Sequence, residues 1–119
     1  MRIACIFNAA REGTTGTYIL RACRALGFTA DHWWLRDVQS IPPTYDLYLR
    51  IDHGDDYSIP LPKALRPCIF YVFDTHLPHS WKKIQRTRSW YDLMVCCHRD
   101  AAERLPGAFL HTDADNEML

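Results

Sequence analysis

The sequence Pro67-Cys68-Ile69-Phe70-Tyr71-Val72-Phe73-Asp74-Thr75-His76 lies near the middle of the chain and indicates its architecture. Residues 68–73 are all apolar or aromatic, and so short a run predicts a strand buried on both faces of a parallel sheet. Pro67 suits the first position of such a strand because it cannot donate a ladder hydrogen bond. The run ends at Asp74 and His76, and in open α/β sheets ligands bind beyond the carboxyl ends of the strands. We therefore expect a central strand with a polar tip, although Asp74 could equally cap the following turn.

Strand patterns and helix patterns alternate on both sides of this stretch. The sequence predicts strands at 2–7, 28–34, 45–51, 68–73, 92–97 and 108–112, and helices at 15–26, 79–89 and 99–105. Thr14 or Thr15 is expected to cap the first helix, Gly27 to end it, and Ser80 to cap the second. Strands that alternate with helices form right-handed crossovers and a parallel sheet. The predicted fold is a single Rossmann-like domain over residues 1–119, a three-layer αβα sandwich with five to six mainly parallel strands.

The expected strand order is 3-2-1-4-5-6 or a shortened form. In the third strand, Leu47, Leu49 and Ile51 alternate with Tyr48 and Arg50. Such partial alternation indicates that one face is less buried. We therefore expect the third strand near an edge of the sheet, with Tyr48 and Arg50 on the less buried face.

The balance of charges and the lack of long apolar runs narrow the class of protein. Fourteen basic and fourteen acidic residues give a net charge of zero, which offers no argument for nucleic acid or for an anionic membrane. A local basic patch is still compatible with the cluster Lys82, Lys83, Arg86 and Arg88. No apolar run approaches the ~20 residues that span a bilayer, and the first residues lack a signal-peptide layout. We expect a cytoplasmic protein with no nucleic-acid partner and no membrane span.

The five cysteines predict reduced thiols in the core. They are Cys5, Cys23, Cys68, Cys96 and Cys97. Their number is odd, they lie in apolar runs and none has CxxC spacing, so neither a disulfide framework nor a zinc site is indicated. The sequence predicts no metal and no cofactor.

The loop Gly13-Thr14-Thr15-Gly16 is the first candidate binding site. It joins the first strand to the first helix, where glycines allow close approach of a ligand and free helix N–H groups attract an anion. The spacing is neither GxGxxG nor a P-loop. The same residues are equally expected of a glycine-bearing turn with a threonine cap.

A second group of candidates follows the third and fourth strands and opens the last helix. It consists of Asp52, His53, Asp55, Asp56, Asp74, His76 and Arg99. A carboxylate or an imidazole can bind an acceptor hydroxyl and act as general base, and we assign that role to His76, Asp74 and His53. Asp52 and Asp55 are expected to bind substrate, and Arg99 to hold an anionic group. The alternatives are a Ca²⁺ or Mg²⁺ site on the carboxylates of the 52–56 loop, a Zn²⁺ site formed by His53, Asp74 and His76, a solvated turn, helix capping and an ion pair that fixes the loop.

The order of these motifs resembles the N-terminal half of bacterial GT-B-fold glycosyltransferases of the spore-maturation-protein or family-1-like group. The resemblance rests on Tyr45 to Gly54, Arg66-Pro67, Asp74-Thr75-His76-Leu77, Tyr91-Asp92-Leu93 and His98 to Leu105, and it covers roughly residues 2–115. His53 and His98 depart from the family, which usually has an acid and a glutamine there.

The resemblance implies an acceptor-side domain that is not catalytically complete alone. A second Rossmann-like domain or a partner subunit would hold the nucleotide-sugar donor, and a sugar acceptor would bind here. Trp33, Trp34, Trp81 and Trp90 more often fill gaps between helix and sheet than stack on sugars. If a second domain normally covers some of them, a homodimer is also expected. The alternative function is a free-standing module that binds a small anion, a nucleotide or another protein.

Overall fold

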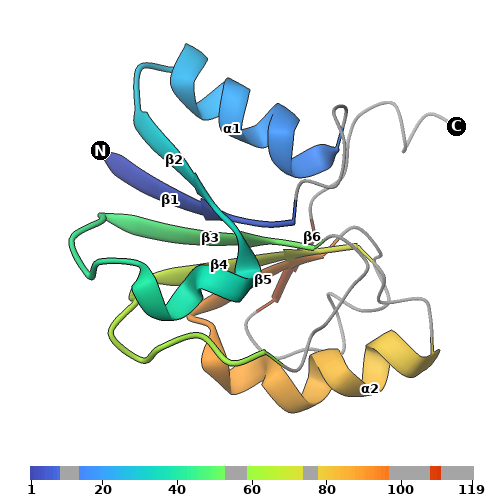
Figure 1. Ribbon diagram of the computed structural model, residues 1–119. Helices are drawn as coiled ribbons and strands as arrows, with labels where there is room; N and C mark the ends of the chain where they lie inside the picture. Colours follow the sequence, from blue (N-terminus) through green and yellow to red (C-terminus); the bar gives the residue numbers. More distant parts are fainter. Residues whose placement is uncertain (9–13, 53–58, 74–77, 97–107, 111–119) are drawn as a thin grey trace, which may run out of the picture.

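The chain forms an α/β sandwich, seen in a computed structural model that describes residues 1–8, 14–52, 59–73, 78–96 and 108–110 (Figure 1). The strands are β1 (Arg2–Ile6), β2 (Thr29–Trp33), β3 (Leu47–Ile51), β4 (Cys68–Val72), β5 (Leu93–Cys96) and β6 (Ala108–Leu110). The helices are α1 (Thr15–Ala25) and α2 (Pro78–Thr87), with 3-10 turns η1 (Leu35–Ser40) and η3 (Arg88–Trp90). The predicted fold class is confirmed, and η1 is an element that the sequence patterns did not predict.

All six strands are parallel, in the order β2-β1-β3-β4-β5-β6. This is the doubly wound order of flavodoxin-like sheets rather than 3-2-1-4-5-6, so the predicted order is wrong. Strand β3 lies between β1 and β4 and not near an edge. The chain passes from β2 across β1 to β3, and this crossover carries η1 on the sheet face opposite α1 (Figure 1).

The predicted exposure of β3 is reversed for its first four residues, whereas Ile51, at 3% exposed, is buried as predicted. Tyr48 is fully buried and Arg50 is 3% exposed, whereas Leu47 and Leu49 are only partly buried. Tyr48 tolerates burial because its hydroxyl donates to the Pro42 carbonyl at 3.0 Å and accepts from the Tyr45 amide at 3.1 Å. Polar side chains whose polar ends are satisfied internally can therefore occupy the more buried face.

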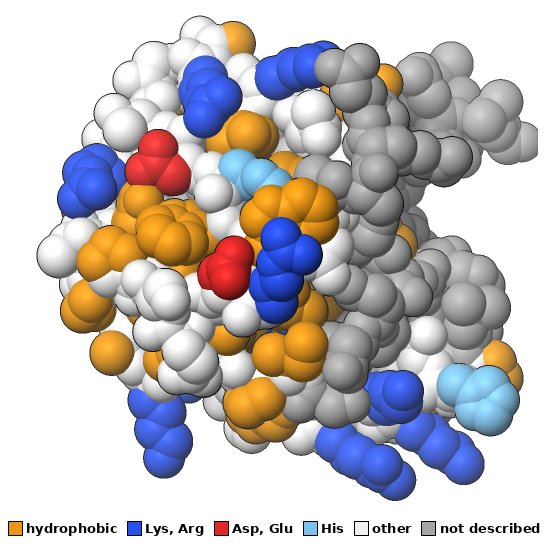
Figure 2. Space-filling model, in the orientation of Figure 1, with side chains coloured by type: hydrophobic (Ala, Val, Ile, Leu, Met, Phe, Trp, Pro, Cys, Tyr) orange, Lys and Arg blue, Asp and Glu red, His pale blue; other side chains and the backbone are white. Residues whose placement is uncertain are grey.

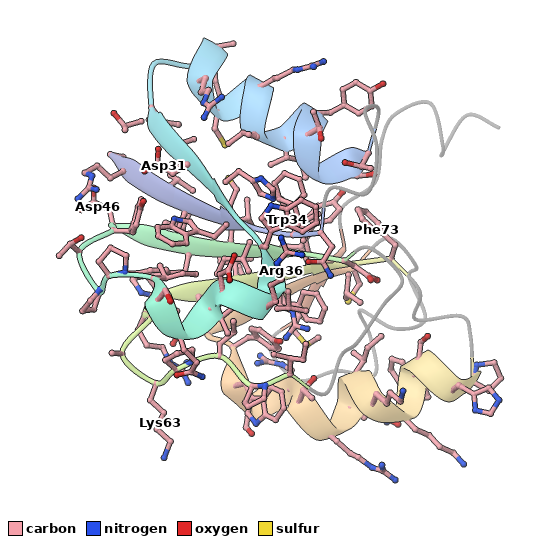
Figure 3. The ribbon with its side chains drawn as sticks, in the orientation of Figure 1. Asp31, Trp34, Arg36, Asp46, Lys63 and Phe73 are labelled. Atoms are coloured by element: carbon pink, nitrogen blue, oxygen red, sulfur yellow. The ribbon has the colours of Figure 1, made fainter. Side chains whose placement is uncertain are left out.

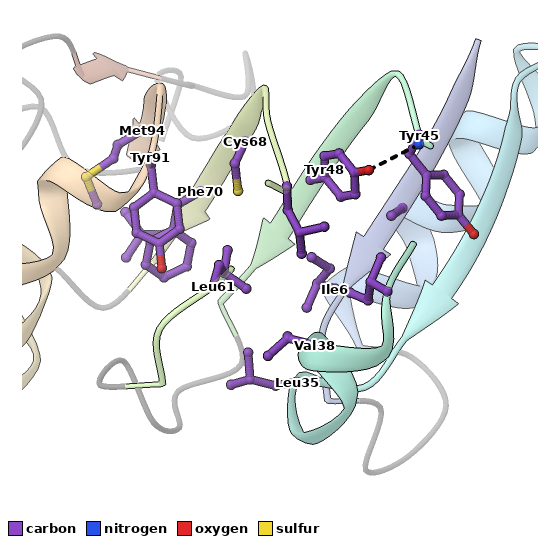
Figure 4. Packing of buried hydrophobic residues seen from close by; sticks show 14 of the residues in the cluster. Ile6, Leu35, Val38, Tyr45, Tyr48, Leu61, Cys68, Phe70, Tyr91 and Met94 are labelled. Carbon is purple, nitrogen blue, oxygen red and sulfur yellow. Dashed lines mark hydrogen bonds between the residues drawn. The ribbon is translucent and has the colours of Figure 1, made fainter. Parts of the chain in front are cut away.

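Two hydrophobic layers sandwich the sheet. The larger one lies on the face of η1 and α2, and Figure 4 shows Ile6, Leu35, Val38, Phe70 and Met94 packed together there. The smaller one lies under α1 and includes Ile3, Cys5, Phe7, Leu20 and Ala30. Each fully buried side chain of this size contributes about 1.5–3 kcal/mol, so these layers hold the sheet that positions the site.

The helix ends follow the sequence closely, with one exception. Thr14 caps α1 by accepting a hydrogen bond from the Thr17 amide at 3.4 Å, and Gly27 ends the helix region with a φ of 91°. Helix α2 begins at Pro78, so Ser80 lies within its first turn and the predicted Ser80 cap is wrong. Proline is favoured at a first helical position because the amide it lacks would have no partner there.

Candidate functional site

The polar centre of the molecule lies where β1 and β3 end side by side. Crossovers leave these two strands in opposite directions, and doubly wound folds bind ligands in the crevice beyond such a switch point. A small cavity of about 10 Å³ occurs there, which is room for about one water molecule. We call it the switch-point cavity. It is lined by Ile6, Phe7, Asn8, Leu35, Arg50, Ile51, Asp52 and Phe70.

Arg50 supplies a buried positive charge to this cavity. Its Nη1 donates to the Ile59 carbonyl at 3.1 Å and to the Tyr91 hydroxyl. The guanidinium carbon lies 5.0 Å from the centroid of the Phe70 ring and 5.9 Å from that of Tyr91, within cation–π range. Arg50 therefore joins β3 to the 59–61 segment and to the start of β5.

Burial and the nearby Arg50 charge both affect the pKa of the Tyr91 hydroxyl. Burial raises the pKa of its hydroxyl to about 12, and the neighbouring Arg50 charge acts in the opposite direction. The phenol is neutral at physiological pH, so its oxygen accepts from Arg50 as a dipole and not as an anion. The positive charge of Arg50 is thus not cancelled by Tyr91.

Asp52 supplies a carboxylate at the same edge. It is 6% exposed, and its Oδ2 accepts a hydrogen bond from the Phe73 amide at 2.9 Å. The Asp52 amide in turn donates to the Tyr71 carbonyl at 2.8 Å. These two bonds fix the residue across the ends of β3 and β4, so its carboxylate lines the cavity in a defined position.

Phe7 and Asn8 line the cavity at the end of β1, next to aromatic residues of β2 and the segment after it. The Asn8 Oδ1 accepts from the Leu35 amide at 3.2 Å, which ties the end of β1 to η1. His32 donates through Nε2 to the Phe7 carbonyl at 2.8 Å, and its ring lies between those of Phe7 and Trp34, with centroids at 4.1 Å and 5.4 Å. Figure 3 labels Trp34 and Arg36 together, and the Arg36 guanidinium carbon lies 4.8 Å from the Trp34 ring centroid.

The predicted loop at the start of α1 is described from Thr14 onward. Thr14 is 8% exposed, and its hydroxyl accepts a hydrogen bond from the Thr17 amide. The Thr14 and Thr17 hydroxyl oxygens lie 2.9 Å apart. Thr15 is exposed. Gly16 faces Phe7, because a Cβ built at Gly16 would lie 2.3 Å from the ring atom Cδ2. Close packing of α1 on β1 therefore accounts for this glycine.

Most of the remaining predicted residues lie outside the described part of the chain, as does the predicted helix over 99–105. They are Gly13, His53, Asp55, Asp56, Asp74, His76 and Arg99. Of the predicted set, Asp52 lines the switch-point cavity. Sequence reasoning did not select Arg50 or Asn8, although an arginine inside an apolar strand, two residues before an aspartate, was a usable signal for Arg50.

Three negative findings concern metal ions, membrane-spanning helices and known relatives. Within the described ranges, no group of three or more His, Cys, Asp or Glu side chains is arranged to hold a metal ion. The same ranges contain no helix with the length and apolarity needed to cross a membrane. No family model, curated protein or solved structure matches the chain.

Proposed function

We propose that this chain is the acceptor-side Rossmann-like domain of a GT-B glycosyltransferase and that its acceptor subsite lies at the switch-point cavity. One observation carries the proposal: the carboxylate of Asp52 is held at the carboxyl end of β3, beside the crevice in which doubly wound folds bind ligands. The ordered motifs that resemble this group of enzymes, and the Rossmann-like fold itself, support it further.

Asp52 has the chemistry that a sugar acceptor requires. A carboxylate accepts hydrogen bonds from hydroxyl groups and can take a proton from an attacking hydroxyl as general base. The cavity beside it has room for about one water, which is also the size of one hydroxyl group. Arg50 acts as a positioning residue, because its bonds to Ile59 and Tyr91 hold the wall against which Asp52 is placed.

Donor chemistry is assigned to a second domain or a partner subunit. In a GT-B enzyme the nucleotide-sugar occupies mainly the other Rossmann-like domain, so this chain is expected to bind an acceptor but not to transfer a sugar alone. The alternative anion site at the start of α1 has less support. The Phe7 ring fills the space beside Gly16, and the Thr14 hydroxyl already caps the helix.

Amide NMR spectra of the ¹⁵N-labelled chain test this proposal. We expect millimolar methyl glucoside or methyl mannoside to shift the amide signals of Asn8, Asp52 and Phe73. Asp52→Asn should weaken binding about tenfold or more, because hydrogen bonds to charged groups contribute about 1.5–3 kcal/mol. Asp46→Asn is the matched control, since Asp46 is exposed at the opposite end of β3 and accepts from the Arg2 amide at 2.7 Å.

Three outcomes would contradict the proposal. The first is transfer of glucose from UDP-glucose by the chain alone, which would show a complete enzyme. The second is a shift of the Thr14 and Thr17 amides by UDP-glucose without any response to the methyl glycosides, which would favour the nucleotide module. The third is equal loss of glycoside binding in Asp52→Asn and Asp46→Asn, with both variants folded by thermal unfolding.

A further inference from the structure

Two adjoining pockets surround Trp90 at the end of the molecule away from the switch-point cavity. One has a volume of about 300 Å³ and is lined by Lys83, Arg86, Thr87 and Trp90. The other has a volume of about 420 Å³ and is lined by Pro60, Leu61, Lys63, Arg66, Ser89 and Trp90. We call these residues together the Trp90 groove. Trp90 is half-buried, packs against the larger core and lines both pockets, each of which also has two basic residues in its lining.

The segments that form the groove are rich in basic residues. The ranges 59–73 and 78–96 carry Lys63, Arg66, Lys82, Lys83, Arg86 and Arg88, and within them Asp92 is the one acid. Asp92 is engaged internally, because its carboxylate pairs with Arg66 at 2.9 Å and accepts from the Cys68 amide at 2.7 Å. In Figure 2 Lys and Arg side chains occur along the lower edge and also at the top, left and centre of this face, and in Figure 3 Lys63 points away from the body.

The groove lies at the amino ends of the strands. Arg66 immediately precedes β4 and Trp90 precedes β5, whereas Asp52 follows the carboxyl end of β3. The two ends of a parallel strand are separated by its full length, about 3.3 Å per residue. The groove is thus separate from the proposed acceptor subsite, and its function does not depend on that proposal.

We propose that the Trp90 groove binds a segment of single-stranded nucleic acid. Such a strand repeats a phosphate, a flat base and another phosphate, and the groove has Lys83 and Arg86 in one pocket, Lys63 in the other and the Trp90 indole lining both. Sequence-independent single-strand sites combine these two features, a positive groove for the backbone and an aromatic side chain for stacking. Lys83 and Arg86 would contact one phosphate group and Lys63 the other, while Arg66 stays paired with Asp92.

Other anionic partners match this arrangement less well. A mononucleotide carries phosphate on one side of its base and would engage one cation pair. A membrane surface is flat and would not enter two pockets of several hundred Å³. An acidic peptide brings carboxylates but no flat ring between them for Trp90.

Fluorescence anisotropy with a labelled octathymidylate and the intact chain tests the proposal at several salt concentrations. Three cation–phosphate contacts predict a slope of log K against log salt of about −2, at about 0.7 for each contact in a single strand. Lys83→Glu should weaken binding several-fold and flatten the slope by about 0.7, because one phosphate is no longer neutralised. Arg21→Glu is the matched control: it makes the same change in charge at an exposed position of α1 and should leave binding unchanged.

Trp90→Phe and Trp90→Ala test the stacking part of the proposal. The loss of one stacked base should weaken binding about 5- to 100-fold in Trp90→Ala, with Trp90→Phe retaining most of it. Because Trp90 also packs on the core, thermal unfolding of each variant is measured first, and Lys83→Glu keeps the test valid if Trp90→Ala does not fold.

Four results would overturn the proposal. The first is no binding of the oligonucleotide at low salt. The second is equal weakening by Arg21→Glu and Lys83→Glu. The third is binding that is unchanged in folded Trp90 variants. The fourth is competition by inorganic polyphosphate that is as strong, charge for charge, as competition by the oligonucleotide, because polyphosphate has no bases to stack.

Discussion

Replacing Gly16 by alanine tests the packing of α1 on β1 at a single point. A Cβ at this position would lie 2.3, 2.4 and 2.7 Å from three atoms of the Phe7 ring. Carbon atoms that touch prefer a separation of about 3.5–4.0 Å. The ring or the helix must therefore move by at least about 1.2 Å, the difference between 3.5 and 2.3 Å.

The expected cost follows from how tightly Phe7 is held. Phe7 is 3% exposed, and its ring lies against His32 with the centroids 4.1 Å apart. Overpacking a well-filled core costs about 1–3 kcal/mol, and three close approaches place this site at the upper end. Alanine recovers up to about 1 kcal/mol of helix propensity over glycine. We therefore expect Gly16→Ala to lower the free energy of unfolding by about 2 kcal/mol.

Urea denaturation followed by tryptophan fluorescence measures this change. A second measurement in a Phe7→Leu background should show a smaller cost of Gly16→Ala, since leucine lacks the ring atoms that clash. Gly27→Ala is the control: Gly27 has a φ of 91° and no atom within 4 Å of a built Cβ, so its cost comes from the backbone and should not change with Phe7→Leu. A Gly16→Ala variant as stable as the parent, or one equally destabilised in both backgrounds, would refute the packing argument.

Three further predictions follow from the buried polar groups. Arg50→Met should lower the free energy of unfolding, measured in urea, by about 3 kcal/mol, because it leaves the Ile59 carbonyl and the Tyr91 hydroxyl without this donor. Arg50→Lys should lower it less. An Arg50→Met variant as stable as the parent would contradict this role. Burial raises the pKa of the Cys5 and Cys68 thiols to about 12. Iodoacetamide at pH 8 should therefore leave both unmodified in the folded chain and modify both in urea, as peptide mapping would show. The pKa of the Tyr91 hydroxyl is also about 12. As the pH rises, the unfolded state therefore loses the protons of Cys5, Cys68 and Tyr91 before the folded state does. The free energy of unfolding should fall between about pH 9 and 12 by up to ~1.4 kcal/mol per pH unit for each group. A constant urea midpoint between pH 8 and 11 would count against it.

The sequence was informative wherever a local pattern determined the structure. Apolar runs located all six strands to within two residues at each end, and Thr14 and Gly27 marked the ends of α1 because capping and a positive φ depend on a few neighbouring atoms. Strand order was not accessible in this way. It depends on which direction each crossover takes, and the crossover from β2 to β3 uses η1, a turn too short to give a helical period.

The candidate site was only partly predictable for a similar reason. Asp52 was selected because carboxylates at strand ends are visible in a linear pattern. Arg50 was assigned to the less buried face, because alternation of polarity assumes that charged side chains point to water. That assumption fails for Arg50, because it donates to Ile59 and Tyr91, which lie nine and 41 residues away along the chain. These bonds exist only in the folded molecule.

The strand order has a consequence for how the chain can be assembled during synthesis. Once β1 and β2 have paired around α1, each later strand joins the free edge left by an earlier one: β3 beside β1, then β4, β5 and β6 in turn. No strand has to be inserted between two that already pair. At about 5–20 residues per second, the ~20 residues from the end of β3 to the end of β4 emerge in roughly 1–4 s. During each such interval a nascent chain on the ribosome presents an open edge at its most recently added strand as well as at β2, and open edges are the feature through which unfinished sheets pair with other chains.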